Sequence, residues 1–261
     1  MSVLMTTSVS NTVFEKIAVK VYNSKNGTSK NFEEINGKCL NLAINNKSAI
    51  PCPDQYVAMI KVTKGKIVEF CPCFDFTIPN NRDKNSKILE NMSDIPVIAV
   101  VLESPHKDEF ENYSAIGPAV GETGENFRLF FEEMLEAAIA NRQLNLIHMK
   151  YRILFINAIQ YQCSLGKPTK KYRDDIFTEM WNYQDSNNQN IVQNDFMGRL
   201  QSNSPAIVIN CCTKGNFKDN EEDKHLRKLV QEAIDKKFSK SLKSTHPCCW
   251  NDYKNRFIIK V

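Results

Sequence analysis

Three polar residues stand at or near the ends of hydrophobic segments that we expect to form strands. Glu103 follows one apolar run, Asn157 lies within a second, and His246 belongs to a Thr-His-Pro segment. A carboxylate can stabilise an oxocarbenium-like state and orient a water, while an imidazole can donate a hydrogen bond to a departing base. An amide can read the edge of a base, because it both donates and accepts. Together the three groups would suit cleavage of an N-glycosidic bond.

Each of these residues also has a plain structural interpretation. A solvated loop glutamate would look the same as Glu103 in a sequence. Asn157 could cap or bridge buried backbone groups, and His246 could belong to an ordinary His-Pro turn. The choice between the catalytic and the structural interpretation therefore depends on the strands and loops that carry the three residues.

The segment 98–131 organises the rest of the chain. Residues 97–102 are all apolar, which is typical of a central parallel strand that is covered on both faces. Glu103 comes at the carboxyl end of this strand, where open α/β sheets place their ligands, and Pro105 ends the strand. After Thr123 a helix is predicted, because Phe127, Phe131 and later apolar residues recur at helical spacing.

The remaining pattern predicts an α/β fold with three layers, α/β/α, around a central, mainly parallel, four-stranded sheet. Further buried strands are expected at 152–159 and 206–210, with helical segments at 171–200 and 226–238. Strand-like segments at 55–62 and 66–77, joined by a turn that contains a glycine, predict a β-hairpin. We expect residues 1–90 to form an N-terminal extension that contains this hairpin, and residues 91–261 to form the α/β domain.

Composition narrows the functional classes. The chain has 261 residues, 42% of them hydrophobic, and contains no run of 18 apolar residues that could span a membrane. The first residues lack the pattern of a signal peptide, which predicts a cytoplasmic protein. The chain has nine cysteines, an odd number that favours reduced thiols over disulfides. It contains no C-x-x-C pair of the kind that binds metals or iron–sulfur clusters, so we expect no metal and no cofactor. From Lys214 onward 12 Lys and Arg stand against 7 Asp and Glu, which suits a phosphate backbone or a solvated basic face.

Five short motifs, in order between residues 97 and 250, together resemble the uracil-DNA glycosylase superfamily, and its iron–sulfur-type branch in particular. Residues 102–105 (Leu-Glu-Ser-Pro) are similar to its Gly-Glu-x-Pro water-activating loop, and 117–124 to its Gly-Arg-Pro-Phe-Val-Gly-x-x-Gly segment. Residues 155–157 resemble the strand with the base-reading asparagine, and 204–208 the strand that follows. The His-Pro pair at 246–247 resembles the family's minor-groove loop.

The resemblance implies roles for particular residues of this chain. Glu103 and His246 would be catalytic. Asn157, Ala119, Ser104, Gly117 and Pro118 would bind the base. The DNA-binding set would be Pro105, Lys240, Lys243, Ser244, Pro247 and Trp250.

Two departures from the family pattern modify these expectations. Ala119 stands where that branch has a phenylalanine that stacks on uracil, which would leave space for a bulkier base. The N-terminal C-x-x-C of the iron–sulfur cluster is absent. Trp250 stands at the position of the family's minor-groove wedge, although burial in the core is the alternative for a tryptophan.

The resemblance therefore implies a monofunctional DNA glycosylase that flips a modified base out of double-stranded DNA and hydrolyses its glycosidic bond. Modified phage DNA, with its hypermodified or glucosylated cytosines, would be one substrate, and antiviral defence one role. Two alternatives stay open at this point. One is a non-catalytic nucleic-acid or nucleotide sensor on the same fold, against which the intact set Glu103, Asn157 and His246 argues. The other is a nucleoside or nucleotide hydrolase, against which the basic C-terminal segment argues.

Overall fold

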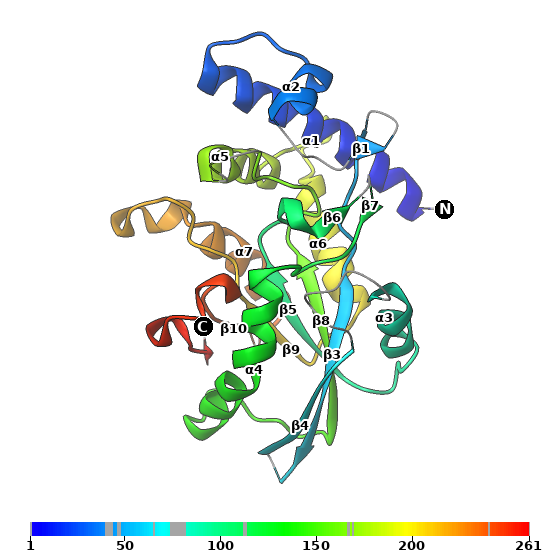
Figure 1. The fold of residues 1–261 in the computed structure, drawn as a ribbon, viewed down its shortest axis with the longest axis vertical. Helices are drawn as coiled ribbons and strands as arrows, with labels where there is room; N and C mark the ends of the chain where they lie inside the picture. The colour runs from blue at the N-terminus through cyan, green and yellow to red at the C-terminus, as the bar shows by residue number, and fades with distance from the viewer. Residues whose placement is uncertain are drawn as a thin grey trace.

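A seven-stranded mixed sheet forms the centre of the computed structural model (Figure 1). The structure describes residues 2–39, 44–45, 48–64, 66–73, 82–111, 114–165, 168, 170–239 and 241–260. The strand order is β11 (Ile259–Lys260), β10 (Ser241–Lys243), β9 (Ile207–Asn210), β5 (Val97–Leu102), β8 (Lys150–Asn157), β3 (Gln55–Thr63) and β4 (Lys66–Pro72). The four strands β10, β9, β5 and β8 run parallel, whereas β11, β3 and β4 pair antiparallel with their neighbours.

The apolar run of β5 explains why this strand lies at the centre. Its six side chains are all buried, and they alternate between two hydrophobic cores. Val97, Ala99 and Val101 belong to one core, while the intervening residues 98, 100 and 102 belong to the other. A strand that buries both faces has to be continuously apolar, as this one is.

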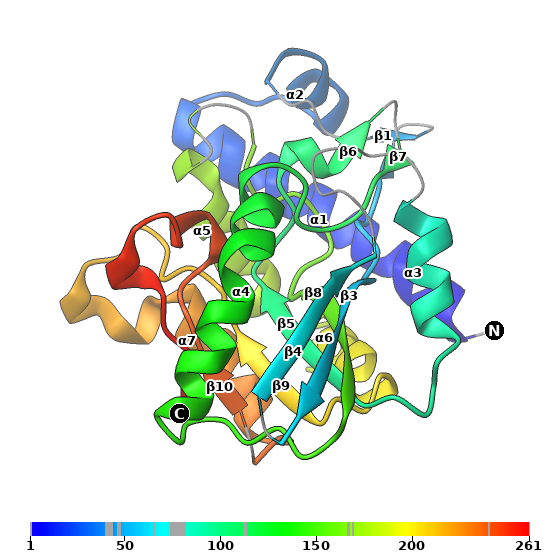
Figure 2. The same cartoon turned by 60° about the horizontal axis from the view of Figure 1, so that its bottom comes forward.

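Helices cover both faces of the sheet. The face of Val97 carries α1 (Ser2–Asn26), α5 (Lys170–Trp181), α6 (Ile191–Ser202) and α7 (Leu226–Asp235). The opposite face carries α4 (Glu122–Ala140) and the short 3-10 helix η3 (Pro247–Cys249). In Figure 2 α4 lies in front of the strands and α6 behind them. The predicted α/β class is thus confirmed.

Smaller elements complete the described chain. The helix α2 (Phe32–Cys39) packs on α1, and α3 (Arg82–Glu90) packs beside β3. Two short hairpins are β1 (Ile44–Asn45) with β2 (Ser48–Ala49), and β6 (Phe110–Glu111) with β7 (Ser114–Ala115). Further 3-10 helices are η1 (Lys107–Glu109), η2 (Asp219–Lys224) and η4 (Tyr253–Asn255). No helix within the described residues has the length and apolar character needed to cross a bilayer.

The expected size of the sheet was wrong. The sequence predicted four strands with a hairpin in a separate N-terminal extension, yet the hairpin β3–β4 extends the same sheet. The reason is the antiparallel pairing of β3 with β8, in which Gln55 faces Phe155 and Ile60 faces Tyr151. The expected boundary at residue 90 therefore falls between segments that share a sheet, and α1 shares a hydrophobic core with α5 and α6.

The connections between the parallel strands determine where a ligand can approach. From β5 the chain crosses through α4 to β8, and from β8 it returns through α5 and α6, on the other face, to β9. Because β8 and β9 flank β5 on opposite sides, the strand order reverses between β5 and β9. The carboxyl ends of strands at such a reversal form the crevice in which α/β sheets bind ligands. Glu103 directly follows β5 at this position.

Candidate active site

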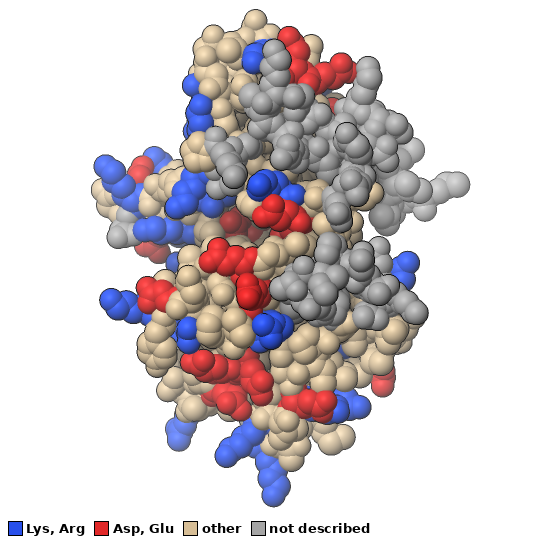
Figure 3. Space-filling model, viewed as in Figure 1, with Lys and Arg blue, Asp and Glu red and all other residues tan. Residues whose placement is uncertain are grey.

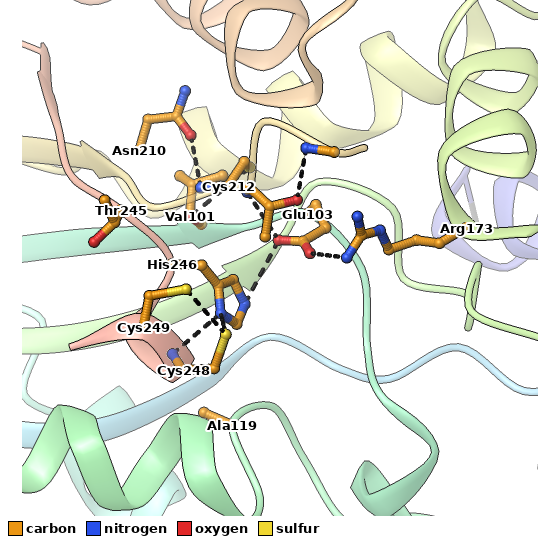
Figure 4. A network of polar contacts seen from close by, with 12 residues as sticks. Val101, Glu103, Ala119, Arg173, Asn210, Cys212, Thr245, His246, Cys248 and Cys249 are labelled. Atoms are coloured by element: carbon orange, nitrogen blue, oxygen red, sulfur yellow. Dashed lines mark hydrogen bonds and ion pairs between the residues drawn. The ribbon is translucent and has the colours of Figure 1, made fainter. Parts of the chain in front are cut away.

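Glu103 presents a buried carboxylate at the carboxyl end of β5. Its exposed fraction is 4%. The backbone N–H of Thr213, in the loop after β9, donates to Oε2 at 3.3 Å, and Nη1 of Arg173 lies 3.9 Å from Oε1 (Figure 4). A buried charge needs such partners, since its desolvation would otherwise be costly. The alternative of a solvated loop glutamate does not fit this burial.

Arg173 reaches the site from α5 and was missed by the sequence analysis. Its guanidinium is held by the neighbouring Asp174, with Nε and Nη2 each 2.8 Å from Oδ1. Asp174 in turn accepts a hydrogen bond from the backbone N–H of Asn216 at 2.7 Å. Arg173 is therefore fixed between two carboxylates, and it offsets the negative charge of Glu103.

His246 lies against the same carboxylate, with its Nε2 3.5 Å from Oε2 of Glu103 (Figure 4). The residue caps η3, because its Nδ1 accepts a hydrogen bond from the backbone N–H of Cys248 at 3.3 Å. An Nδ1 that accepts leaves the proton of a neutral ring on Nε2. Burial lowers the pKa of His246, and Glu103 opposes this shift only in part. Near neutral pH the ring is thus a neutral donor that points its N–H toward Glu103.

Asn157 ends β8 beside this pair, and Leu102 of β5 is its partner in the parallel register. Its exposed fraction is 1%, yet neither Oδ1 nor Nδ2 has a hydrogen-bond partner among the described residues. The backbone is nevertheless held firmly, since Nη2 of Arg199 donates to the carbonyl oxygen of Asn157 at 3.0 Å. Arg199 is itself fixed by both carboxylate oxygens of Asp54, each at 2.7 Å. A buried amide without partners is rare and calls for an explanation.

The loop between β7 and α4 brings three residues of the predicted base-binding set close to the sheet. Gly117 has a φ of +129°, a backbone conformation that favours glycine, and a Cβ there would lie 2.2 Å from Oε1 at the end of the Gln55 side chain. Ala119 has a φ of +58°, and its N–H donates to Oε1 of the buried Glu109 at 2.9 Å. Pro118 is buried as well. Ser104, the fifth member of the set, is partly exposed next to Glu103.

Ala119 does not leave open space in the described structure. Its side chain is fully buried and belongs to the core cluster that also contains Phe127 and Trp250. In Figure 4 it lies on the α4 side of His246 and Cys248. The expected room for a bulky base would therefore have to come from movement of the loop or from other residues.

Most of the predicted DNA-binding residues are not on the surface. Pro105, Ser244, Pro247 and Trp250 are buried, so they present little surface to DNA in this conformation. Lys243 is partly exposed on β10, where it lines a cavity of about 250 Å³ together with residues of α7. Lys240 lies outside the described residues. Of these residues only Trp250 was assigned by its distance from His246 in the sequence. The strand β10 that precedes His246 pairs with β9 in the sheet.

Trp250 is a core residue, which was the alternative to its role as a minor-groove wedge. Its ring stacks on Phe131, with centroids 6.3 Å apart and an interplanar angle of 9°. Its Nε1 donates to the carbonyl oxygen of Thr245 at 3.1 Å. This packing ties the loop that carries His246 to α4.

We predict that Trp250→Ala destabilises the chain by about 3–5 kcal/mol, because it leaves a large cavity in the core. Thermal unfolding should show a fall in melting temperature of roughly 10 °C or more. Tyr253→Ala is the matched control, since this aromatic side chain follows in the same loop but is 77% exposed. Its effect should stay within about 0.5 kcal/mol. An unchanged melting temperature for Trp250→Ala would contradict the core assignment.

A cavity of about 400 Å³ lies at the opposite edge of the sheet, near the beginnings of β8, β9 and β10. Leu144, Ile147, Tyr151, Ile207 and Leu242 contribute to its lining. None of the site residues described above borders it, so its size says nothing about the chemistry at the carboxyl ends. Within the described residues no group of three or more His, Cys, Asp or Glu side chains could hold a metal ion.

Comparison with known proteins adds no family. No family model, no curated protein and no solved structure matches this chain. The site must therefore be interpreted from its own geometry. That geometry joins a buried carboxylate, a neutral histidine and an arginine in direct contact, with a buried asparagine amide on the neighbouring strand.

Proposed function

We propose that this chain is a DNA glycosylase, which hydrolyses the N-glycosidic bond of a flipped-out modified base and leaves an abasic site. The observation that carries the proposal is the amide of Asn157. The amide is buried and has no hydrogen-bond partner among the described residues, and it lies on the strand next to β5, which is followed by Glu103 with His246 beside it. A base edge offers the donors and acceptors that such an amide lacks.

Each side chain then has a distinct part in the reaction. Glu103 orients the attacking water and stabilises the positive charge that develops on the sugar. Arg173 offsets the charge of Glu103 in the free protein and holds its Oε1 side. His246 donates its Nε2–H to the base as negative charge develops there. No lysine nucleophile takes part, so the product is an intact abasic site rather than a cleaved strand.

Double-stranded DNA is the proposed partner, and the distribution of surface charge indicates the side of the site on which its phosphates would lie. Figure 3 shows Lys and Arg side chains gathered over α5 and the segment before α7, and Asp and Glu side chains over α4. The exposed cations of α5 and of the described segment between β9 and α7 are Lys170, Lys171, Lys214, Lys218 and Lys224. Phosphates would lie along this side of the site, and binding would weaken as the salt concentration rises.

The test is release of a base from modified DNA under single-turnover conditions. Duplexes from phage genomes with hypermodified or glucosylated cytosines are the first substrates, with unmodified and uracil-containing duplexes beside them. Mass spectrometry should find the free base, and mild alkali should then cleave the strand at the abasic site. Equal hydrolysis of free nucleosides would instead indicate a nucleoside hydrolase, and binding without release a sensor. Release from phage DNA would give the proposed role in antiviral defence its chemical basis.

Asn157→Ala should separate binding of the base from stability of the fold. The side chain makes no hydrogen bond in the described structure, so its loss should change the free energy of unfolding by less than about 1 kcal/mol. Base release should fall by roughly 5-fold to 150-fold, because a good amide–base pair is worth about 1–3 kcal/mol.

Asn210→Ala is the matched control for this experiment. Asn210 is also a buried asparagine at the end of a parallel strand, but its Nδ2 donates to the carbonyl of Arg227 at 2.9 Å and to Gln231 at 3.0 Å. Its Oδ1 accepts from the N–H of Cys212 at 3.1 Å. Loss of these bonds should cost about 1–3 kcal/mol of stability. If Asn157→Ala were as destabilising as Asn210→Ala, the amide would be structural.

A further inference from the structure

Two neighbouring thiols, one of which contacts the imidazole of His246, have no part in the proposed chemistry. Cys248 and Cys249 are consecutive residues of η3, and both are partly exposed. Their sulfur atoms lie 3.7 Å apart, and the sulfur of Cys248 lies 3.1 Å from Nδ1 of His246 (Figure 4). The three side chains thus form a chain of contacts that ends at Glu103.

We propose that Cys248 and Cys249 form a reversible oxidation site, which a hydroperoxide converts to a disulfide and which thereby displaces His246. The effect on base release rests on the proposed function. The modification itself does not, because the thiols and their contacts are independent of the substrate.

Cys249 is the thiol that reacts first. The hydrogen bond from Cys248 lowers the pKa of Cys249, so that more of it is thiolate near neutral pH, whereas the same contact raises the pKa of Cys248. The thiolate attacks one oxygen of the hydroperoxide. An S–O bond forms and the O–O bond breaks, which leaves a sulfenic acid on Cys249 and, after protonation, water or an alcohol.

Cys248 then closes the disulfide. Its thiol gives its proton to Nδ1 of His246, 3.1 Å away, while its sulfur attacks the sulfenic sulfur of Cys249. An S–S bond forms and the S–O bond breaks, and the hydroxide that leaves takes up the proton as water. Overall the two thiols lose two protons and two electrons, which together are two hydrogen atoms, and the hydroperoxide is the oxidant that is reduced.

Closure must disturb the residue that caps η3. Consecutive Cα atoms lie about 3.8 Å apart, whereas disulfides usually join Cα atoms about 4.4–6.8 Å apart. A disulfide between Cys248 and Cys249 is therefore strained. We expect the strain to distort the backbone of η3, including the adjacent N–H of Cys248 that donates to Nδ1 of His246. The oxidised protein should lose the alignment of Nε2 with Glu103. A strained disulfide of this kind is also easily reduced, which makes the change reversible.

The chain contains its own control in a second consecutive pair. Cys211 and Cys212 follow β9 and are fully buried. Burial raises the pKa of Cys212, which holds it in the unreactive thiol form. Sequence alone does not distinguish the two Cys-Cys pairs, but the structure predicts that only the pair at 248–249 reacts.

The experiment treats the folded full-length chain with limiting hydrogen peroxide, alkylates the remaining thiols with iodoacetamide and digests with trypsin. Residues 244–254 form one tryptic peptide that holds Cys248 and Cys249 and no other cysteine. Residues 200–214 form the control peptide with Cys211 and Cys212. We expect the first peptide to lose about 2 Da, for two hydrogen atoms, and to resist alkylation until dithiothreitol is added. The control peptide should be fully alkylated.

An activity measurement on the same samples tests the effect on His246. Base release by the oxidised wild type should fall by about 10²-fold, as for a lost hydrogen-bond donor, and dithiothreitol should restore it. Cys249→Ser should keep its basal rate and be insensitive to peroxide.

Three results would overturn the proposal. They are an unmodified 244–254 peptide, equal oxidation of both cysteine pairs, and equal peroxide inhibition of Cys249→Ser. If the chain releases no base from any DNA, the proposed function fails. The peptide masses still decide whether the oxidation site exists.

Discussion

Replacing Glu103 by glutamine should lower the rate of base release by roughly 10²–10⁴-fold, the range expected for a positioned acid–base group. Glutamine keeps the size of the side chain, and its amide oxygen can still accept the hydrogen bond from the N–H of Thr213. It lacks the charge that would stabilise the sugar cation, and it is a poor acceptor for a proton of the attacking water. The loss should therefore fall on the chemical step.

The fold and the binding of DNA should survive this substitution. Removing one partner of a buried ion pair is usually destabilising, but Arg173 keeps Asp174 at 2.8 Å. Loss of a negative charge near the phosphates should leave the affinity for DNA unchanged or raise it. Single-turnover rates and fluorescence titrations with the same duplex measure the two effects separately.

Glu133→Gln is the matched control for Glu103→Gln. Glu133 lies on α4 and its side chain is 54% exposed, with Arg256 at 3.6 Å, so the same chemical change there should alter neither rate nor stability. A wild-type rate in Glu103→Gln would remove this carboxylate from the mechanism. An equal loss in both variants would point to net charge as the cause.

The parts of the site that could be predicted are those that depend on a short stretch of sequence alone. Six consecutive apolar residues identify β5 as a strand buried on both faces, and the first polar residue after it is Glu103. Asn157 was predicted within a buried strand at 152–159, and the structure ends β8 at this residue. Parallel strands place their carboxyl ends at one edge, so the two residues could be expected there together before the structure was known.

The parts that could not be predicted depend on contacts between distant segments. Arg173 lies in a polar helix like any other, and only the packing of α5 beside the end of β5 brings it to Glu103. The sequence of the hairpin β3–β4 does not indicate which strand it pairs with, because the antiparallel pairing of β3 with β8 uses backbone groups. Trp250 was placed by counting along a family motif, whereas its own apolar surface determines that it packs on Phe131.

His246→Ala should lower base release by about 10²–10³-fold, since one donor to the developing negative charge is lost. His246→Gln is the informative companion, because its amide can reach the same region and donate a hydrogen bond. It should recover part of the rate. If both variants were as fast as the wild type while Asn157→Ala was slow, the leaving base would take its hydrogen bond from another group.

The pH dependence of the wild type gives this prediction a second measurement. Burial lowers the pKa of His246 below its ordinary value of 6.5. Glu103 and Glu122 raise this pKa, whereas Arg173 and His106 lower it further. Protonation would place a hydrogen on Nδ1, where the N–H of Cys248 now donates, and would disturb η3. Activity should therefore hold at pH 6.5 and fall only at lower pH.

The stability of the fold should also depend on pH. As the pH falls, His246 takes up its proton in the unfolded chain before it does so in the folded protein, so stability should decline below about pH 6.5. His246→Gln should lack both effects of this group, so an acid limb identical to that of the wild type would assign the titration to another residue.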